Sequence, residues 1–291
     1  MSDLSDLTIK TFTEADDIRD AGLSDPEGVE HVDDIRYGED PRWQVMDLYR
    51  PAGRGEKLPV IVSVHGGGWV YGDKERYRYY CMDLARRGFA VANFTYRLAP
   101  AHKFPAPLED LNLVLRWLRA HAEEQCLDMD NLFAVGDSAG AHCLGLYCDI
   151  LGNPAYASSF PFRVPEGLAF RAVALNCGVY RMTPLRKDEP SLLRDYLPKG
   201  GTDEEIRMLD ICGNMSDTFP PAFIMTAPQD FLKPQAAVIA ALLAEKNVEH
   251  LLRFYVDEAC SLAHVFHLNM RSDWARRCND DECAFFRAHM A

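Results

Sequence analysis

Hydrophobic residues along the chain fall into short apolar runs, separated by longer segments in which apolar and polar positions alternate at helical spacing. Short runs rich in β-branched residues are typical of strands buried on both faces of a sheet. We predict such strands over residues 58–64, 89–96, 132–135, 172–175, 222–226 and 250–256. We predict helices over residues 107–124, after residue 138, over 234–246 and over 273–289. This alternation predicts an α/β protein with a mostly parallel sheet and right-handed crossovers.

The N-terminal part of the chain departs from this alternation. Residues 1–40 are polar and irregular. Two stretches in which apolar and polar residues alternate, over residues 29–37 and 43–49, predict an antiparallel pair of edge strands. We expect this extension to belong to a single domain that comprises residues 1–291, because one large sheet fills such a length in many α/β proteins.

A second departure is the segment 178–221, which is longer than an ordinary connection. It contains proline, charge clusters and two short helix-like pieces, over residues 191–196 and 203–211. We interpret it as a small insertion over the functional site, a possible lid, with a plain surface excursion as the alternative.

Composition and charge narrow the class of protein. Of the 291 residues, 48% are hydrophobic and 26% are charged, as in a globular protein with a sizeable core. The 44 acidic and 31 basic residues give a net charge of −13, which argues against nucleic acid or an anionic membrane surface as a partner. The first residues lack the pattern of a secretory signal, and no apolar stretch is long enough for a membrane span. We therefore expect a soluble, cytoplasmic protein, whose oligomeric state stays open, a homodimer included.

The sequence Gly136-Asp137-Ser138-Ala139-Gly140 lies between a predicted strand and a predicted helix. The pattern Gly-x-Ser-x-Gly in this context predicts a nucleophile elbow, a sharp turn that exposes a reactive serine. Glycines two residues either side of the serine avoid clashes with neighbouring backbone. We therefore predict Ser138 as a nucleophile, with a simple glycine-rich turn as the alternative.

A second glycine-rich run, HGGGW at residues 65–69, directly follows the predicted strand 58–64. Consecutive glycines let the backbone N–H groups approach a substrate carbonyl and stabilise the oxyanion that develops on it. We predict Gly67, Gly68 and Ala139 as these donors. A phosphate-binding loop is the alternative, but the Lys-Ser or Lys-Thr that would follow it is missing.

A serine nucleophile needs a histidine base, and the base needs a carboxylate partner. In a hydrolase with this elbow the acid follows a late strand. Asp230 lies just after the predicted strand 222–226 and is our first candidate, although a turn or helix-capping role would also suit it. Asp257 and Glu258 follow the next strand and are the rival acids.

The base is expected in the loop between the last strand and the last helix. Two histidines lie there, His264 and His267, and loop position alone does not separate them. We favour His264 as the base and expect the other histidine to be structural.

Further residues near these motifs are candidates for substrate contacts, and two residue pairs carry side chains that can bind metals. The residues flanking the elbow and the glycine run that we predict to contact substrate are His65, Trp69, Tyr71 and Asp137. The pairs without the spacing of a zinc site are His142 with Cys143 and Cys278 with Cys283. We therefore expect no metal and no cofactor.

Taken together, six motifs resemble the hormone-sensitive-lipase-like esterases over residues 44–290. They are HGGGW at 65–69, YRLAP at 96–100, FPAPLED at 104–110, GDSAG at 136–140, PQDFL at 228–232 and AHVFH at 263–267. Within that group the chain is similar to bacterial carboxylesterases of the acetyl-xylan or feruloyl esterase type. The resemblance implies an α/β-hydrolase fold with about eight strands and helices on both faces.

The resemblance also bears on the site residues. It implies Gly67, Gly68 and Ala139 as oxyanion donors and Asp230 as the acid, and it favours His264, because a phenylalanine follows that histidine two residues later. Two regions do not match. Residues 1–40 do not resemble the helical cap of the lipase-like members, and residues 178–221 match no motif.

We therefore expect hydrolysis of short-chain, acetyl-like carboxylic esters through an acyl-enzyme, with acetylated carbohydrates among the candidate substrates. One alternative is an aryl formamide hydrolase of the kynurenine-formamidase type, which uses the same triad logic. Another is a hydrolase-fold binding protein without catalytic activity.

Overall fold

The strands of the protein form one sheet. The computed structural model describes residues 2–187, 189–257, 259 and 261–291. Its strands are β1 (Val29–Arg36), β2 (Val45–Pro51), β3 (Leu58–Val64), β4 (Ala90–Phe94), β5 (Leu127–Asp137), β6 (Ala172–Asn176), β7 (Ala222–Thr226) and β8 (His250–Phe254). They lie in the order β1-β2-β4-β3-β5-β6-β7-β8; β1, β2 and β4 pair antiparallel, and all other neighbours are parallel. The predicted fold class is confirmed.

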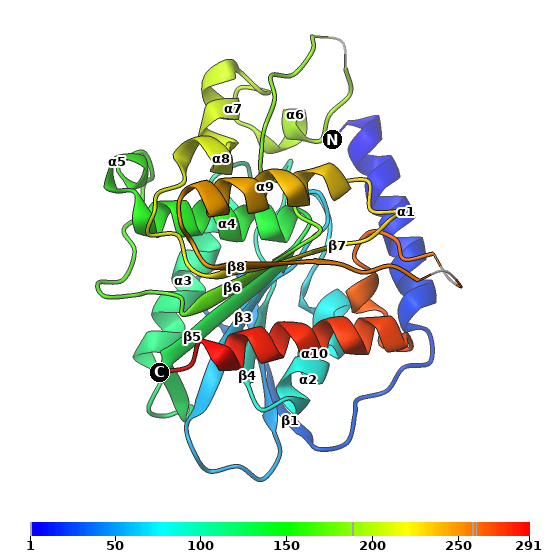
Figure 1. The fold of residues 1–291 in the computed structure, drawn as a ribbon, viewed down its shortest axis with the longest axis vertical. Helices are drawn as coiled ribbons and strands as arrows, with labels where there is room; N and C mark the ends of the chain where they lie inside the picture. Colours follow the sequence, from blue (N-terminus) through cyan, green and yellow to red (C-terminus); the bar gives the residue numbers. More distant parts are fainter. Residues whose placement is uncertain (1, 188, 258, 260) are drawn as a thin grey trace.

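Helices cover both faces of this sheet (Figure 1). On one face lie α2 (Lys74–Arg86) and α10 (Asp273–Ala288), and on the other lie α3 (Ala106–Ala120), α4 (Ala139–Gly152) and α9 (Lys233–Glu245). Successive side chains of a strand point to opposite faces, so Val60 and Val62 pack in the α4 layer while Ile61 packs in the α2 layer. Sequence analysis did not predict α2. None of the helices in the described chain has the length and apolar composition needed to cross a bilayer.

The N-terminal segment was predicted to be irregular, and this was wrong. Residues Asp3–Asp20 form helix α1, which runs along one side of the molecule (Figure 1). Only Ser5 of this helix is buried, so the segment lacks the apolar stripe by which surface helices are predicted. Its first turn is tied instead to Asp195, whose carboxylate accepts hydrogen bonds from the hydroxyls of Ser2 and Ser5 at 2.7 and 2.6 Å.

The insertion 178–221 carries three short helices, α6 (Leu193–Tyr196), α7 (Asp203–Leu209) and α8 (Ile211–Asn214), which lie above α4 (Figure 1). A further short helix, α5 (Pro154–Ala157), follows α4. The side chain of Tyr196 stacks on Trp69 with ring centroids 5.1 Å apart, so the insertion packs on the glycine run that follows β3. Its role as a lid stays a prediction.

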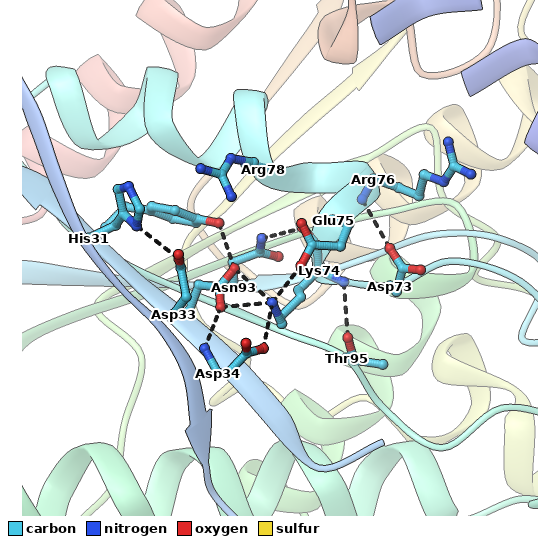
Figure 2. A network of polar contacts seen from close by, with 12 residues as sticks. His31, Asp33, Asp34, Asp73, Lys74, Glu75, Arg76, Arg78, Asn93 and Thr95 are labelled. Atoms are coloured by element: carbon cyan, nitrogen blue, oxygen red, sulfur yellow. Dashed lines mark hydrogen bonds and ion pairs between the residues drawn. The ribbon is translucent and has the colours of Figure 1, made fainter. Parts of the chain in front are cut away.

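The start of α2 is fixed to the sheet by a buried lysine (Figure 2). Lys74 Nζ lies 2.9 Å from the fully buried carboxylate of Asp47, 3.1 Å from Asp34 and 2.6 Å from Glu75. Asn93 of β4 donates to the backbone carbonyl of Lys74 at 2.7 Å. A buried carboxylate is tolerated where a cation and hydrogen bonds satisfy it. This cluster sets the position from which α2 reaches the functional site.

Candidate active site

Ser138 lies at the sharp turn between β5 and α4. Its backbone has φ 51° and ψ −119°, a conformation rare for a residue with a side chain. A Cβ on Gly136 would lie 2.7 Å from the backbone carbonyl of Gly140, and one on Gly140 would collide with the carbonyl oxygen of Val64. Both motif glycines are therefore required by close backbone approach, as the sequence argument proposed.

The structure brings Ser138, His264 and Asp230 together. His264 Nε2 lies 3.0 Å from Ser138 Oγ, and His264 Nδ1 lies 2.6 Å from Asp230 Oδ1. The loops after β7 and β8 run side by side, because Gln229 forms a parallel bridge with Ala263. This pairing holds the acid and the imidazole at hydrogen-bonding distance, although 34 residues separate them in the chain.

Asp230 is buried and well supplied with donors. Its Oδ2 accepts a hydrogen bond from Thr226 Oγ1 at 2.7 Å, and its Oδ1 also accepts one from the backbone N–H of Leu232 at 2.9 Å. Burial alone would raise the pKa of Asp230, but the hydrogen bonds from His264 and Thr226 outweigh it and hold the pKa below its usual value. The carboxylate is therefore ionised at neutral pH and orients the imidazole.

The rival residues lie elsewhere. Asp257 accepts a hydrogen bond from Trp274 Nε1 at 2.6 Å, and Glu258 lies outside the described residues. His267 is fully buried, with its ring edge-on to Tyr80 at 5.2 Å. Burial lowers the pKa of His267 to about 3, so this histidine is a neutral residue of the core.

The glycine run after β3 forms a tight loop beside Ser138. Gly67 and Gly68 have φ of 115° and 61°, and the amides of Val70 and Tyr71 both donate to the carbonyl of Gly67. Within the described chain, no backbone group accepts a hydrogen bond from the amides of Gly67 and Gly68. Ala139 is the first residue of α4, where helical amides have no acceptor within the helix. These three amides are available to a ligand.

The chain is similar in sequence to known ester hydrolases. The BD-FAE family matches residues 46–180. The chain is 34% identical over 232 residues to the carboxylic ester hydrolase LipN of Mycobacterium tuberculosis, covering 76% of this chain and 61% of LipN. It is 30% identical over 218 residues to carboxylesterase NlhH of the same species, covering 69% of this chain and 65% of NlhH. The chain therefore spans less than two thirds of the length of these relatives.

A solved structure covers almost the whole chain. Esterase B from Lactobacillus rhamnosis superposes with a TM-score of 0.88 at 27% sequence identity, over 98% of this chain and 95% of that one. The chain is an α/β-hydrolase related to the carboxylesterases. The resemblance inferred from the sequence motifs is confirmed.

A tyrosine of α2 links the glycine loop to the turn that carries Ser138. Tyr77 Oη accepts a hydrogen bond from the backbone N–H of Gly66 at 2.8 Å and donates one to Asp137 Oδ2, also at 2.8 Å. Burial raises the pKa of Asp137 to about 7, against the opposing effect of the Tyr77 hydrogen bond. Sequence analysis missed Tyr77, because no local pattern marks which helical tyrosine reaches a distant loop.

Ser138 of the hydrolase opens into a cavity of about 240 Å³. Its lining consists of Phe12, Ala15, Asp16, Arg19, Gly66, Gly67, Tyr71, Tyr77, Asp137, Ser138, Phe231, His264, Val265 and Leu268. The first four belong to α1, so the unpredicted helix forms one wall. Tyr71 joins that wall to the glycine loop by donating a hydrogen bond to Asp16 at 2.9 Å. Arg19 also pairs with Asp16, at 2.8 Å.

Two of the four residues predicted to contact substrate lie outside the cavity lining. Tyr71 and Asp137 line the cavity of the hydrolase, whereas His65 and Trp69 do not. His65 is fully buried and stacks on Tyr96 with centroids 3.9 Å apart. Trp69 has a left-handed φ of 64°, and its ring packs against the insertion instead of the cavity. His65 and Trp69 therefore pack on the side of the glycine loop that faces away from the cavity.

One group of potential metal ligands overlaps the site. The ligand atoms of Cys177, Asp230 and His264 lie within 4.8 Å of one another. In the hydrolase, however, His264 and Asp230 are bonded to each other, so a cation would have to replace that hydrogen bond. The donor set is better explained as an acid-base pair.

Proposed function

We propose that the protein is a serine carboxylesterase that hydrolyses small esters through an acyl-enzyme, with Ser138 as nucleophile, His264 as base and Asp230 as its orienting acid. The observation that carries the proposal is the position of His264, whose Nε2 lies 3.0 Å from the serine hydroxyl while its Nδ1 contacts the ionised acid. With its proton on Nδ1, facing the carboxylate, such an imidazole accepts the serine proton at Nε2.

The steps follow from this geometry. Ser138 Oγ attacks the ester carbonyl while its proton moves to His264 Nε2, and Asp230 stabilises the imidazolium that forms. The oxyanion accepts hydrogen bonds from the amides of Gly67, Gly68 and Ala139. The imidazolium then protonates the leaving alcohol as the acyl-enzyme forms. Water, deprotonated by the same imidazole, releases the carboxylic acid and restores the serine.

The cavity supports a short acyl chain. A volume of about 240 Å³ is small for a ligand site, and Phe12, Phe231, Val265 and Leu268 give it apolar walls. Esterase B, the structural relative, is described as inhibited by a tributyrin phosphonate, a compound with four-carbon chains. We extend the proposal to acetylated carbohydrates, because Asp16 and Arg19 place polar groups in the α1 wall.

The test is a panel of p-nitrophenyl esters of increasing chain length, with an acetylated sugar and an aryl formamide beside them. We expect turnover to be highest for acyl chains of two to about six carbons, because the cavity is small. Ser138→Ala should abolish turnover and labelling by a fluorophosphonate while the protein stays folded. An unlabelled wild-type protein would indicate a binding protein instead, and a preference for the formamide would reassign the substrate.

A further inference from the structure

The strand beside the nucleophile ends in a buried polar residue. β6 ends at Asn176, which pairs with Asp137 at the end of β5. The backbone N–H of Ser138 donates a hydrogen bond to the carbonyl of Asn176 at 2.9 Å. Because Ser138 has a left-handed φ, its backbone persists only where surrounding contacts determine it. A shift of Asn176 therefore moves the nucleophile.

The side chain of Asn176 is held in turn by a carboxylate on α10. Asn176 Nδ2 donates to Glu282 Oε2 at 2.7 Å, and the hydroxyl of Tyr80 on α2 donates to Glu282 Oε1 at 2.9 Å. Both Asn176 and Glu282 are fully buried. One acceptor thus ties the helices of one face of the sheet to the strand end that supports Ser138.

Packing alone does not account for this acid. The layer around it is apolar, with Cys278, Cys283 and Phe286 on the same helix. Burial of a carboxyl group without a bonded cation is unfavourable, and among the described residues no cation forms an ion pair with Glu282. Arg87, the residue that follows α2, forms its ion pairs with Asp83 and Asp280. Glu282 therefore depends on the hydrogen bonds from Asn176 and Tyr80.

The segment that Glu282 holds also lies beside the triad acid. Cys177 follows Asn176 with a left-handed φ of 47°, and its Sγ lies within 4.8 Å of the ligand atoms of Asp230 and His264. The Cys177 amide donates to the carbonyl of Met225 on β7 at 2.9 Å. Residues 176–177 therefore contact the nucleophile on one side and approach the acid and base on the other.

We propose that Glu282 is a positioning residue for the nucleophile, fixing through the Asn176 side chain the carbonyl that holds the backbone of Ser138. It does so without touching the substrate. The inference rests on the proposed esterase function, since it assigns Glu282 a part in presenting the serine hydroxyl.

Two variants of the full chain test this. Glu282→Leu removes the hydrogen bonds from Asn176 and Tyr80. Glu282→Gln keeps the size of the side chain and retains both hydrogen bonds if the Asn176 amide group flips, so that its oxygen accepts from the glutamine. The control is Asp149→Leu, because Asp149 is an equally buried carboxyl on α4, in the opposite layer. Measurements are kcat and KM on p-nitrophenyl butyrate, the rate of fluorophosphonate labelling of Ser138, and the Tm.

We expect Glu282→Leu to lower kcat and the labelling rate about 10- to 100-fold with KM changed by less than about threefold, since a misplaced nucleophile affects the chemical step. Glu282→Gln should restore both rates to within about threefold of the wild type. Wild-type labelling of Glu282→Leu would overturn the proposal. So would an equal loss of kcat and labelling rate in Asp149→Leu.

A measurement independent of activity separates this proposal from the esterase assignment. Hydrogen exchange at the Ser138 amide should become faster in Glu282→Leu and stay unchanged in Asp149→Leu, because only the former loosens its acceptor. Unchanged exchange in Glu282→Leu would overturn the positioning role even in an active enzyme. A wild-type protein that is never labelled would overturn the esterase function alone. If Glu282→Leu fails to fold, Tyr80→Phe removes one of the two donors and should show the same changes, about threefold in size.

Discussion

The two walls of the cavity are held in place by different forces. The wall that carries Ser138 and the glycine loop is built from strand ends where a Cβ on Gly140 would collide with backbone. The facing wall is α1, where Leu7 and Ile18 are 60% and 77% exposed. Hydrogen bonds and ion pairs at its ends tether this helix, including those to Asp195. The residues of the proposed mechanism therefore lie on the rigid wall, and the facing wall, α1, is expected to open at low energetic cost.

The largest expected effect comes from a substitution in the wall that carries Ser138 and the glycine loop. Gly140→Ala places a methyl group against the carbonyls of Val64 and His65, which cannot move without displacing β3. We expect a loss of stability of about 3 kcal/mol or more and no measurable labelling of Ser138. Thermal unfolding and phosphonate labelling measure both. Gly55→Ala, where a Cβ meets open space, is the matched control and should stay within about 0.5 kcal/mol of the wild type.

A smaller change loosens the same wall without a clash. Tyr77→Phe leaves the Gly66 amide and the Asp137 carboxyl without their shared partner. An unsatisfied buried group costs about 1–3 kcal/mol, and we expect kcat to fall about tenfold with KM little changed. Steady-state kinetics and urea unfolding are the measurements. In Tyr147→Phe, which removes a buried hydroxyl bonded to Asn112 in the opposite layer, stability should fall similarly while kcat is retained. Equal losses of kcat in both variants would contradict a role for Tyr77 in the loop.

The buried acid on α10 makes the stability of the rigid wall depend on pH. Burial raises the pKa of Glu282 to about 7, although the hydrogen bonds from Asn176 and Tyr80 lower it. The charge of Arg87 also lowers this pKa, and that of Asp83 raises it. The folded protein thus binds this proton more tightly than the unfolded chain, so the stabilisation is complete below the ordinary glutamate pKa and is lost as pH rises towards about 7. Glu282→Gln removes this loss.

Urea unfolding at pH 5, 6 and 7 measures how the stability of the wild type and of Glu282→Gln changes with pH. The stability of Glu282→Gln relative to the wild type should increase with pH, by at most about 1.4 kcal/mol per unit for one group. A difference that shrinks as pH rises would show that the carboxylate is stabilised on folding.

The smallest effect concerns the tethered wall. Asp195→Ala releases the hydroxyls of Ser2 and Ser5 at the start of α1. We expect less than about 1 kcal/mol of destabilisation, because little apolar surface is involved. KM for longer acyl chains should change by about threefold, while labelling of Ser138 by a small phosphonate stays at the wild-type rate. Asp217→Ala, an exposed acid of the same insertion, is the control and should change neither. A large fall in the labelling rate of Asp195→Ala would show that α1 supports the reacting groups as well.

Several features of the protein followed from sequence alone. The bounds of β3 and β7 were predicted at the observed residues, because strands buried on both faces appear in the sequence as continuous apolar runs. The elbow was predicted from two glycines whose spacing reflects backbone contacts within a few residues. Asp230 was proposed from its position after a strand. His264 was favoured over its neighbour His267 from the start, and the family resemblance strengthened that choice.

The sequence by itself thus determined the sheet, the elbow and the chemical types in the site, because local spacing encodes burial and backbone conformation. Only the tertiary structure decided what surrounds them. Ser5 meets Asp195 across 190 residues and Tyr80 meets Glu282 across 202, and neither contact leaves a periodic pattern in the chain. A polar hydrogen bond between distant segments depends on where both ends arrive after folding, so the α1 wall and the support beneath Ser138 became visible only in three dimensions.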